Sequence, residues 1–166
     1  MLHCLRQLLS LTACFLFLVG CATQSANNLL TQSDTLGAKK QNGPDLVKLY
    51  LQGKKHQENA QYSEAVSAYE AILAKDPDFV EAHNGLGVIY SVQEKFELAL
   101  NHLQTAVRLA PLAAHLHNNL GYTYFLLGQN EKAIKEFEQS LHLDPDNEKA
   151  QFNLSLIQKN SAKSGE

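Results

Sequence analysis

The sequence has few cysteines, and their positions limit the chemistry available to most of the chain. The three cysteines, Cys4, Cys14 and Cys21, all lie within the first 21 of 166 residues. Beyond Cys21 the chain therefore has no thiol, no disulfide and no soft sulfur ligand for a metal. We expect this larger part to fold without covalent cross-links.

Motifs of catalysis and metal binding are also missing. The seven histidines include no His-x-x-x-His pair, and His115 and His117, two residues apart, point in different directions on a helix. The chain has neither the Gly-x-Ser-x-Gly turn of a serine hydrolase nor a glycine-rich phosphate loop. We therefore expect no metal, no cofactor and no catalytic residue, and an enzyme is the least favoured class of function.

The apolar run at the amino terminus is too short to cross a membrane. Leu8 to Val19 spans 12 residues, whereas a membrane-spanning helix needs about 20. With Arg6 before it, the run fits the apolar segment of a secretory signal peptide over residues 1–20. The run ends in Leu-Val-Gly-Cys21, which resembles the bacterial lipobox. That resemblance implies cleavage between Gly20 and Cys21 and lipid attached to Cys21; an ordinary signal peptide with an incidental cysteine is the alternative.

Cleavage there would leave a weakly acidic chain. Residues 1–20 contain one of the 14 basic residues and none of the 17 acidic ones, so 13 basic residues remain against 17 acidic ones. This balance argues against nucleic acid or an anionic lipid surface as a partner. The membrane would be reached through the lipid on Cys21. By the lipoprotein resemblance, Ala22 favours the outer membrane of a Gram-negative cell, with the protein facing the periplasm.

From residue 46 onward the sequence has a period of 34 residues that recurs three times. One glycine, one alanine and one proline position keep this interval in every copy: Gly53, Gly87 and Gly121; Ala65, Ala99 and Ala133; Pro77, Pro111 and Pro145. A period of this length predicts a stack in which each repeat is one supersecondary unit.

The spacing and the residue types resemble the tetratricopeptide repeat, with copies over 46–79, 80–113 and 114–147. Leu86-Gly87 and Leu120-Gly121 match the family's pattern, whereas Leu49, His83 and His117 take the place of its usual early tryptophan. The resemblance implies an all-α fold, a right-handed α-solenoid of three helix pairs followed by a capping helix. It also implies protein binding rather than catalysis.

The period has a physical explanation in helix packing. Gly53, Gly87 and Gly121 fall inside the first helix of each pair, where glycine costs about 1 kcal/mol relative to alanine. That cost is tolerable if the missing side chain lets the second helix, with its small alanine, approach closely. The prolines are expected to end each pair, because an interior proline removes a backbone donor and clashes one turn back.

The segments that flank the repeats differ from them in composition. Residues 21–44 are rich in Ser, Thr, Asn and Gln and are predicted to form a flexible linker after the lipidated cysteine. Residues 148–159 repeat the first-helix pattern with Ser155 in place of the glycine, and we expect them to form the capping helix. Residues 160–166 are predicted to be a disordered tail.

Under the resemblance, the first helices line a concave groove for a protein or peptide ligand. The residues expected to line it are Tyr50, Lys54, Asn84, Val88, Val92, His115, Asn118, Asn119, Tyr122, Leu126, Phe152, Asn153 and Leu156. The asparagines can hold a peptide backbone, because an amide both donates and accepts hydrogen bonds, or they only face solvent. The exposed apolar members also leave self-association open.

Chaperone-binding relatives hold a peptide's terminal carboxylate with a clamp of cationic residues. The corresponding positions here are Tyr50, Lys54, Gly85, His115 and Asn119. Only Lys54 is a lysine or arginine, and it stands where the clamp uses an amide. The clamp is therefore not expected.

These features predict a lipid-anchored periplasmic adaptor that binds protein partners. By resemblance, small lipoproteins built from such repeats assist the assembly of type IV or tight-adherence pili and of secretion channels at the outer membrane. An adaptor that recruits or regulates cell-wall hydrolases is the alternative.

Overall fold

The structure is a computed structural model that describes residue 43 and residues 45–163, with side chains up to residue 159. The predicted signal peptide, Cys21 and all of the predicted linker except residue 43 lie outside the described residues. Gly43 itself has helical conformation, although the prediction assigns it to a flexible linker. In the part of the chain that is described, no helix is long and apolar enough to cross a membrane.

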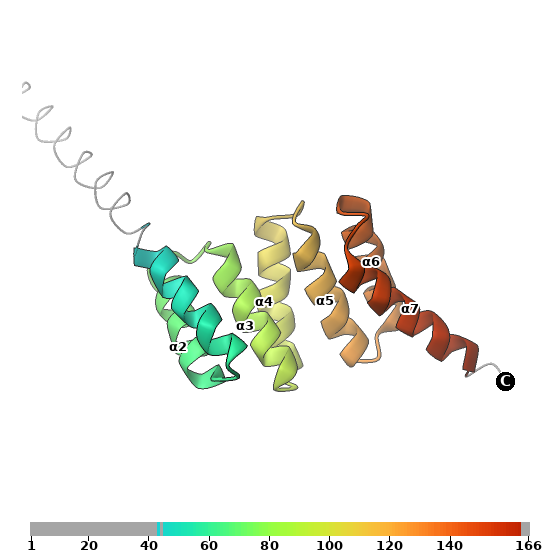
Figure 1. Ribbon diagram of the computed structural model, residues 1–166, viewed down its shortest axis with the longest axis horizontal. Helices are drawn as coiled ribbons and strands as arrows, with labels where there is room; N and C mark the ends of the chain where they lie inside the picture. The colour runs from blue at the N-terminus through green and yellow to red at the C-terminus, as the bar shows by residue number, and fades with distance from the viewer. Residues whose placement is uncertain (1–42, 44, 164–166) are drawn as a thin grey trace, which may run out of the picture. The chain divides into compact units, whose positions relative to one another are not determined.

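The described residues form seven helices, and consecutive helices pack side by side along the array (Figure 1). The first spans residues 45–58. The others are α2 (Tyr62–Leu73), α3 (Val80–Val92), α4 (Phe96–Leu109), α5 (Ala114–Leu126), α6 (Asn130–Leu143) and α7 (Glu148–Lys163). They make three helix pairs and a final single helix, so the predicted all-α solenoid is confirmed.

The turns between pairs contain the periodic prolines. Pro77, Pro111 and Pro145 lie between the end of one pair and the start of the next helix. In the first and third of these turns, an aspartate before the proline accepts a backbone N–H two residues later: Asp78 donates to Asp76 Oδ1 at 3.3 Å, and Asp146 to Asp144 Oδ1 at 3.2 Å. These local bonds compete with helix continuation.

The periodic glycines lie where the two helices of a pair cross. A β-carbon on Gly87 would lie 2.4 Å from Leu103 Cγ, and one on Gly121 would lie 2.8 Å from Phe137 Cδ1 and 3.2 Å from the carbonyl oxygen of Ala133. In the first pair, the neighbour of Gly53 is the Tyr69 ring, at 2.9 Å from such a β-carbon. The three periodic alanines, Ala65, Ala99 and Ala133, are fully buried. The crossings therefore have no room for a side chain at these glycines.

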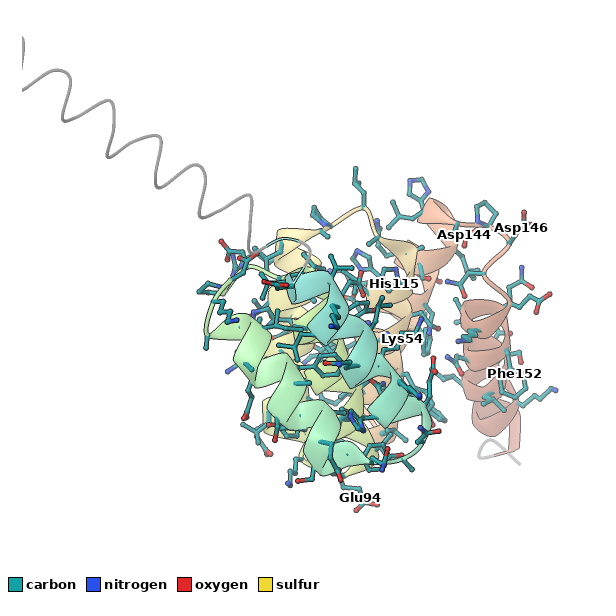
Figure 2. The ribbon with its side chains drawn as sticks, turned by 60° about the vertical axis from the view of Figure 1, so that its left-hand side comes forward. Lys54, Glu94, His115, Asp144, Asp146 and Phe152 are labelled. Atoms are coloured by element: carbon teal, nitrogen blue, oxygen red, sulfur yellow. The ribbon has the colours of Figure 1, made fainter. Side chains whose placement is uncertain are left out.

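The turns inside the pairs share a backbone conformation that the sequence did not reveal. Ala60, Glu94 and Gly128, spaced by 34 residues, have φ angles of 57°, 58° and 70°. Figure 2 shows Glu94 at the tip of the turn between α3 and α4. Only glycine adopts this left-handed conformation without penalty, and other residues pay roughly 1–2 kcal/mol. Two of the three repeats therefore contain a strained turn.

The helix over residues 45–58 has a polar side where later repeats have an apolar one. Lys48 and Lys55 are exposed, whereas Ala82 and Ile89, one period later, are fully buried. Leu51, between these lysines on the same side, is 57% exposed, so charged and apolar side chains share this side of the first helix.

The last helix is longer than predicted. Helix α7 continues to Lys163, whereas the sequence analysis ends the capping helix at 159 and assigns 160–163 to a disordered tail. Neither glycine nor proline occurs in residues 160–163, so nothing in this segment stops the helix. Ala150 and Ile157 are the buried residues that attach α7 to the array.

Candidate inner binding face

The helix over residues 45–58, α3, α5 and α7 together form one face of the array, here called the inner face. In α3, α5 and α7 its residues fall into three rows. The charged row, near the helix starts, consists of Glu81, His115 and Lys149. The amide row consists of Asn84, Asn118, Asn119 and Asn153. The apolar row, nearer the helix ends, consists of Val88, Val92, Tyr122, Leu126 and Leu156.

A cavity of about 400 Å³ opens on the inner face. Six of the predicted groove residues line it: Tyr50, Lys54, Asn84, Val88, His115 and Asn119. Both Lys54 and His115 are labelled in Figure 2. The other seven predicted residues do not line this cavity: Val92, Asn118, Tyr122, Leu126, Phe152, Asn153 and Leu156. The predicted groove therefore includes the cavity and extends beyond it.

The four asparagines of the amide row are bonded to one another in a directional chain. Asn153 Nδ2 donates to Asn118 Oδ1 at 3.0 Å, Asn118 Nδ2 to Asn119 Oδ1 at 3.4 Å, and Asn119 Nδ2 to Asn84 Oδ1 at 2.8 Å. The chain links α7 to α5 and α5 to α3. Each amide keeps a second N–H beyond this chain. The asparagines thus tie neighbouring repeats together; Asn118 is buried, whereas Asn84, Asn119 and Asn153 are half-buried.

At the end of the amide chain, Glu81 forms an ion pair with His115. Glu81 Oε1 lies 3.4 Å from His115 Nε2. The hydrogen bond with Glu81 raises the pKa of His115, although burial acts in the opposite direction. In turn, the hydrogen bond from His115 lowers the pKa of Glu81, against the effect of burial, and Asn84 and Lys54 lower it further. The carboxylate is therefore held in its charged form.

Two tyrosines line the cavity, the buried Tyr69 and the half-buried Tyr50. The Tyr69 hydroxyl donates to Gln57 Oε1 at 2.9 Å, and its ring centroid lies 6.1 Å from that of Tyr50. Burial raises the pKa of Tyr69 well above its usual range, with Tyr50 and Glu58 adding to the effect. The neutral hydroxyl is thus a hydrogen-bond donor, not a base.

Several cavity residues were missed by the sequence analysis. They are Glu58, Tyr69, Glu81, Gly85 and Lys149. Gly85 admits the Tyr69 ring, because a β-carbon there would lie 2.4 Å from Tyr69 Cε2. The sequence signal for this contact was a second glycine, two residues before the periodic Gly87. Lys149 lies 34 residues after His115, so the same period identifies it as a member of the charged row.

The apolar row leaves large side chains in contact with water. Val92 is 55% exposed, and Tyr122 and Leu126 are each 41% exposed. Phe152 on α7, one period after Asn118, is 62% exposed and projects from its helix in Figure 2. Such a concentration of exposed apolar side chains is typical of a surface that contacts another protein.

Two histidines outside the inner face, His83 and His117, connect helices to the turns before them. His83 Nε2 bonds to the carbonyl oxygen of Pro77 at 2.9 Å, and His117 Nε2 to that of Pro111 at 3.0 Å. Their Nδ1 atoms bond to helix residues one period apart, His102 at 3.0 Å and Glu136 at 2.7 Å. Within the described residues, no group of three or more His, Cys, Asp or Glu is placed to hold a metal ion.

Two curated relatives match the repeats of this chain, and both relatives are much longer than it. SPINDLY of Arabidopsis thaliana, a probable peptide N-acetylglucosaminyltransferase, is 34% identical over 96 residues, which are 58% of this chain and 10% of SPINDLY. The chloroplastic tetratricopeptide repeat domain-containing protein PYG7 of the same plant is 33% identical over 75 residues, or 45% of this chain and 25% of PYG7. The chain thus spans a quarter or less of the length of these relatives.

Comparison with solved structures finds the same fold. The first repeat domain of Spaghetti (RPAP3), bound to an HSP90 peptide, superposes with a TM-score of 0.66 at 26% identity, covering 70% of this chain and 93% of that domain. The O-GlcNAc transferase of Thermobaculum terrenum gives a TM-score of 0.69 at 28% identity, covering 70% of this chain and 22% of the transferase. The sequence profile of the tetratricopeptide repeat matches residues 50–92 and 90–148, which is more than half of the chain. The chain therefore belongs to the tetratricopeptide repeat family, whose domains mediate protein–protein interactions.

Proposed function

We propose that this protein is an adaptor that holds a segment of a partner protein on its inner face and catalyses no reaction. The observation that carries the proposal is the composition of that face. It combines a cavity of about 400 Å³ with a row of asparagine amides and a row of exposed apolar side chains. Large apolar side chains are also exposed elsewhere in the described residues, at Val47, Leu51, Leu98 and Leu112, but those positions have no amide row beside them.

We do not expect this protein to hold its partner by a clamp on a terminal carboxylate, as chaperone-binding relatives do. The RPAP3 domain was solved with an HSP90 peptide, but the clamp positions in this chain contain a single lysine, Lys54. His115, at another of these positions, is already paired with Glu81. We therefore expect the partner segment to bind without a clamp on its terminal carboxylate.

We further propose that the adaptor is anchored to the outer membrane by lipid on Cys21 and assists the assembly of a pilus or secretion channel. Support comes from the Leu-Val-Gly-Cys21 pattern after the apolar run and from the resemblance to small repeat lipoproteins. Cys21→Ala should release the protein from membranes or leave the leader uncleaved. Cell fractionation and the mass of the mature chain measure this outcome. A variant that remains membrane-bound at the mature mass would contradict the anchor.

Site-specific crosslinking in intact cells tests the binding face. A photoreactive amino acid replaces Tyr122 on the inner face or, as a matched control, Leu98 on α4, which is similarly exposed at 48%. We expect adducts with a partner protein at position 122 and not at position 98. A pilus or secretion-channel subunit in those adducts would support the assembly role. Equal adducts at both positions, or none at either, would rule out the inner face as the binding surface.

A further inference from the structure

We propose that acid loosens α4 from α3 in the second repeat and tightens α6 against α5 in the third. This inference goes beyond the proposed adaptor function and does not depend on it. It follows from two side-chain pairs at equivalent repeat positions, His83 with His102 and His117 with Glu136. Each pair joins the first helix of its repeat to the second.

Hydrogen bonds determine where the protons lie in the first pair when both rings are neutral. His83 Nε2 lies 2.9 Å from the carbonyl oxygen of Pro77, which can only accept, so Nε2 carries the ring hydrogen. The Nδ1 atom of the same neutral ring is then an acceptor. His102 Nδ1, at 3.0 Å, therefore carries a hydrogen and donates it to His83 Nδ1. The pair is complete without any added proton.

An added proton has no favourable place in this pair. On His83 Nδ1 it would face the N–H of His102 across 3.0 Å, and on His102 it would put a charge on a half-buried ring. Among the described residues, no carboxylate forms an ion pair or a hydrogen bond with either ring. Burial, and then His83, lower the pKa of His102. The closed contact thus binds a proton less readily than the open one, and acid favours opening.

The groups around the first pair do not offset an added positive charge. The Tyr90 ring of α3 lies 5.7 Å from that of His102, and Lys95 Nζ, from the turn between α3 and α4, lies 5.8 Å from the Tyr90 ring. Burial raises the pKa of Tyr90, and Glu70 of α2 adds to this effect, so the tyrosine hydroxyl is neutral. Within the part of the chain that the structure describes, no titratable group of α5 bonds to either histidine ring.

The pair in the third repeat has the opposite requirement. His117 Nε2 lies 3.0 Å from the carbonyl oxygen of Pro111, and His117 Nδ1 lies 2.7 Å from Glu136 Oε2. Both partners accept hydrogen bonds when Glu136 is charged, so only a ring with hydrogens on both nitrogens donates to both. The bond between that charged ring and the carboxylate is also stronger than a neutral one. Acid therefore completes this contact.

The surroundings of the second pair contain no further ionic partner. Tyr124, one period after Tyr90, accepts a hydrogen bond from Gln104 of α4 at 2.9 Å, and Lys132 Nζ lies 5.3 Å from its ring. Among the described residues, no titratable group of α4 or α7 forms an ion pair with His117 or Glu136.

The first repeat provides an internal reference for the other two. Leu49 and Ala68 occupy the equivalent positions there, one period before His83 and His102, and neither side chain titrates. The contact between the first helix and α2 should therefore be insensitive to acid at these positions.

Hydrogen–deuterium exchange of the full chain tests the opposite responses. Mass spectrometry follows it at about pH 7.5 and about pH 5.5, on either side of the usual histidine pKa, with correction for the intrinsic effect of pH on exchange. An opening that takes up one proton becomes more frequent by up to about tenfold per pH unit. We expect exchange in α4 to rise severalfold relative to α2, and exchange in α6 to fall. A rise in α6 equal to that in α4, or no rise in α4, would overturn the inference.

Exchanging the two partners should exchange the two responses. His102→Glu gives the second repeat the pair of the third and should abolish the acid-induced rise in α4. Glu136→His gives the third repeat two facing histidines and should produce such a rise in α6. As matched controls, Asn101→Glu and Glu138→His place the same side chains at exposed positions of the same helices and should leave exchange within about twofold of the wild type. Equal effects of paired and exposed substitutions would show that these pairs are not the cause.

NMR of the nitrogen nuclei in the histidine rings gives a test that needs no variant. In the wild-type chain at about pH 7.5, where free histidine is mostly neutral, His83 should carry its hydrogen on Nε2 and His102 should carry its hydrogen on Nδ1. These positions follow from the Pro77 carbonyl and the contact between the two Nδ1 atoms. A neutral His102 with its hydrogen on Nε2 would contradict the proposed pair, even if the substituted chains failed to fold.

Discussion

Replacing Gly121 by leucine should separate α5 from α6. The first added atom alone would lie 2.8 Å from Phe137 Cδ1 and 3.2 Å from the Ala133 carbonyl oxygen. Neither neighbour has room to move, because Phe137 is fully buried and the oxygen belongs to the backbone of α6. Overpacking of this kind costs about 3 kcal/mol, at the upper end of its usual range. Leucine returns about 1 kcal/mol through its better helix propensity.

The net loss in the free energy of unfolding should therefore be about 2 kcal/mol. For a folded region of this size that corresponds to a fall in melting temperature of about 8 °C. Thermal denaturation followed by circular dichroism measures it.

The chain contains its own control for this substitution. Ser155 occupies the same repeat position in α7, against which the described residues place no following helix, and its hydroxyl donates to the Phe152 carbonyl oxygen at 2.7 Å. Ser155→Leu should change stability by less than about 0.5 kcal/mol, as surface substitutions do. If Gly121→Leu melts within about 2 °C of the wild type, or if both variants lose the same amount, close approach at the crossing is not the reason for the glycine.

Other predictions concern the turns, the amide row and the histidines. Glu94→Gly should raise stability by about 1 kcal/mol because φ is positive there, and urea unfolding that shows no gain would count against strain. Asn118→Ala should cost about 1–2 kcal/mol, since it deprives Asn153 of its acceptor; a loss near zero in the same assay would mean that water replaces the amide. Burial, and then His83, lower the pKa of His102 below its usual 6.5. The unfolded chain therefore takes up this proton more readily than the folded one, and stability falls as the pH drops below 6.5. His102→Gln should lessen this loss of stability in acid. The pKa of His115 is raised, so its contribution is full below pH 6.5 and disappears as the pH rises through its folded pKa; His115→Gln should therefore deepen the acid loss, and equal pH profiles for the two variants would contradict these opposite signs.

The repeating part of the fold could be predicted because the same steric requirement recurs at fixed intervals. Gly87 and Gly121 each face a side chain that excludes a β-carbon. Glycine is therefore needed at the same position of each repeat, and the period becomes visible in the sequence. The left-handed turns were not predicted, because Ala60 and Glu94 tolerate their strain and only Gly128 shows the expected residue type.

The pairings of the inner face could not be predicted from the period. The amide bonds join Asn84 to Asn119 and Asn118 to Asn153, residues that are 35 apart rather than 34. The period aligns equivalent residues but does not give this one-residue offset. Glu81 and His115 are one period apart, so the period aligns them, but it does not show that their side chains form an ion pair.

The direct bonds within the amide row restrain the spacing of neighbouring helices through the same groups that a ligand would contact. Asn119 links α5 to α3, and Asn153 links α7 to α5, on the inner face. A ligand that takes over either bond removes a restraint on the spacing of two helices, and one that bridges both amides adds a new restraint. The spacing of these helices would therefore respond to whatever occupies the amide row.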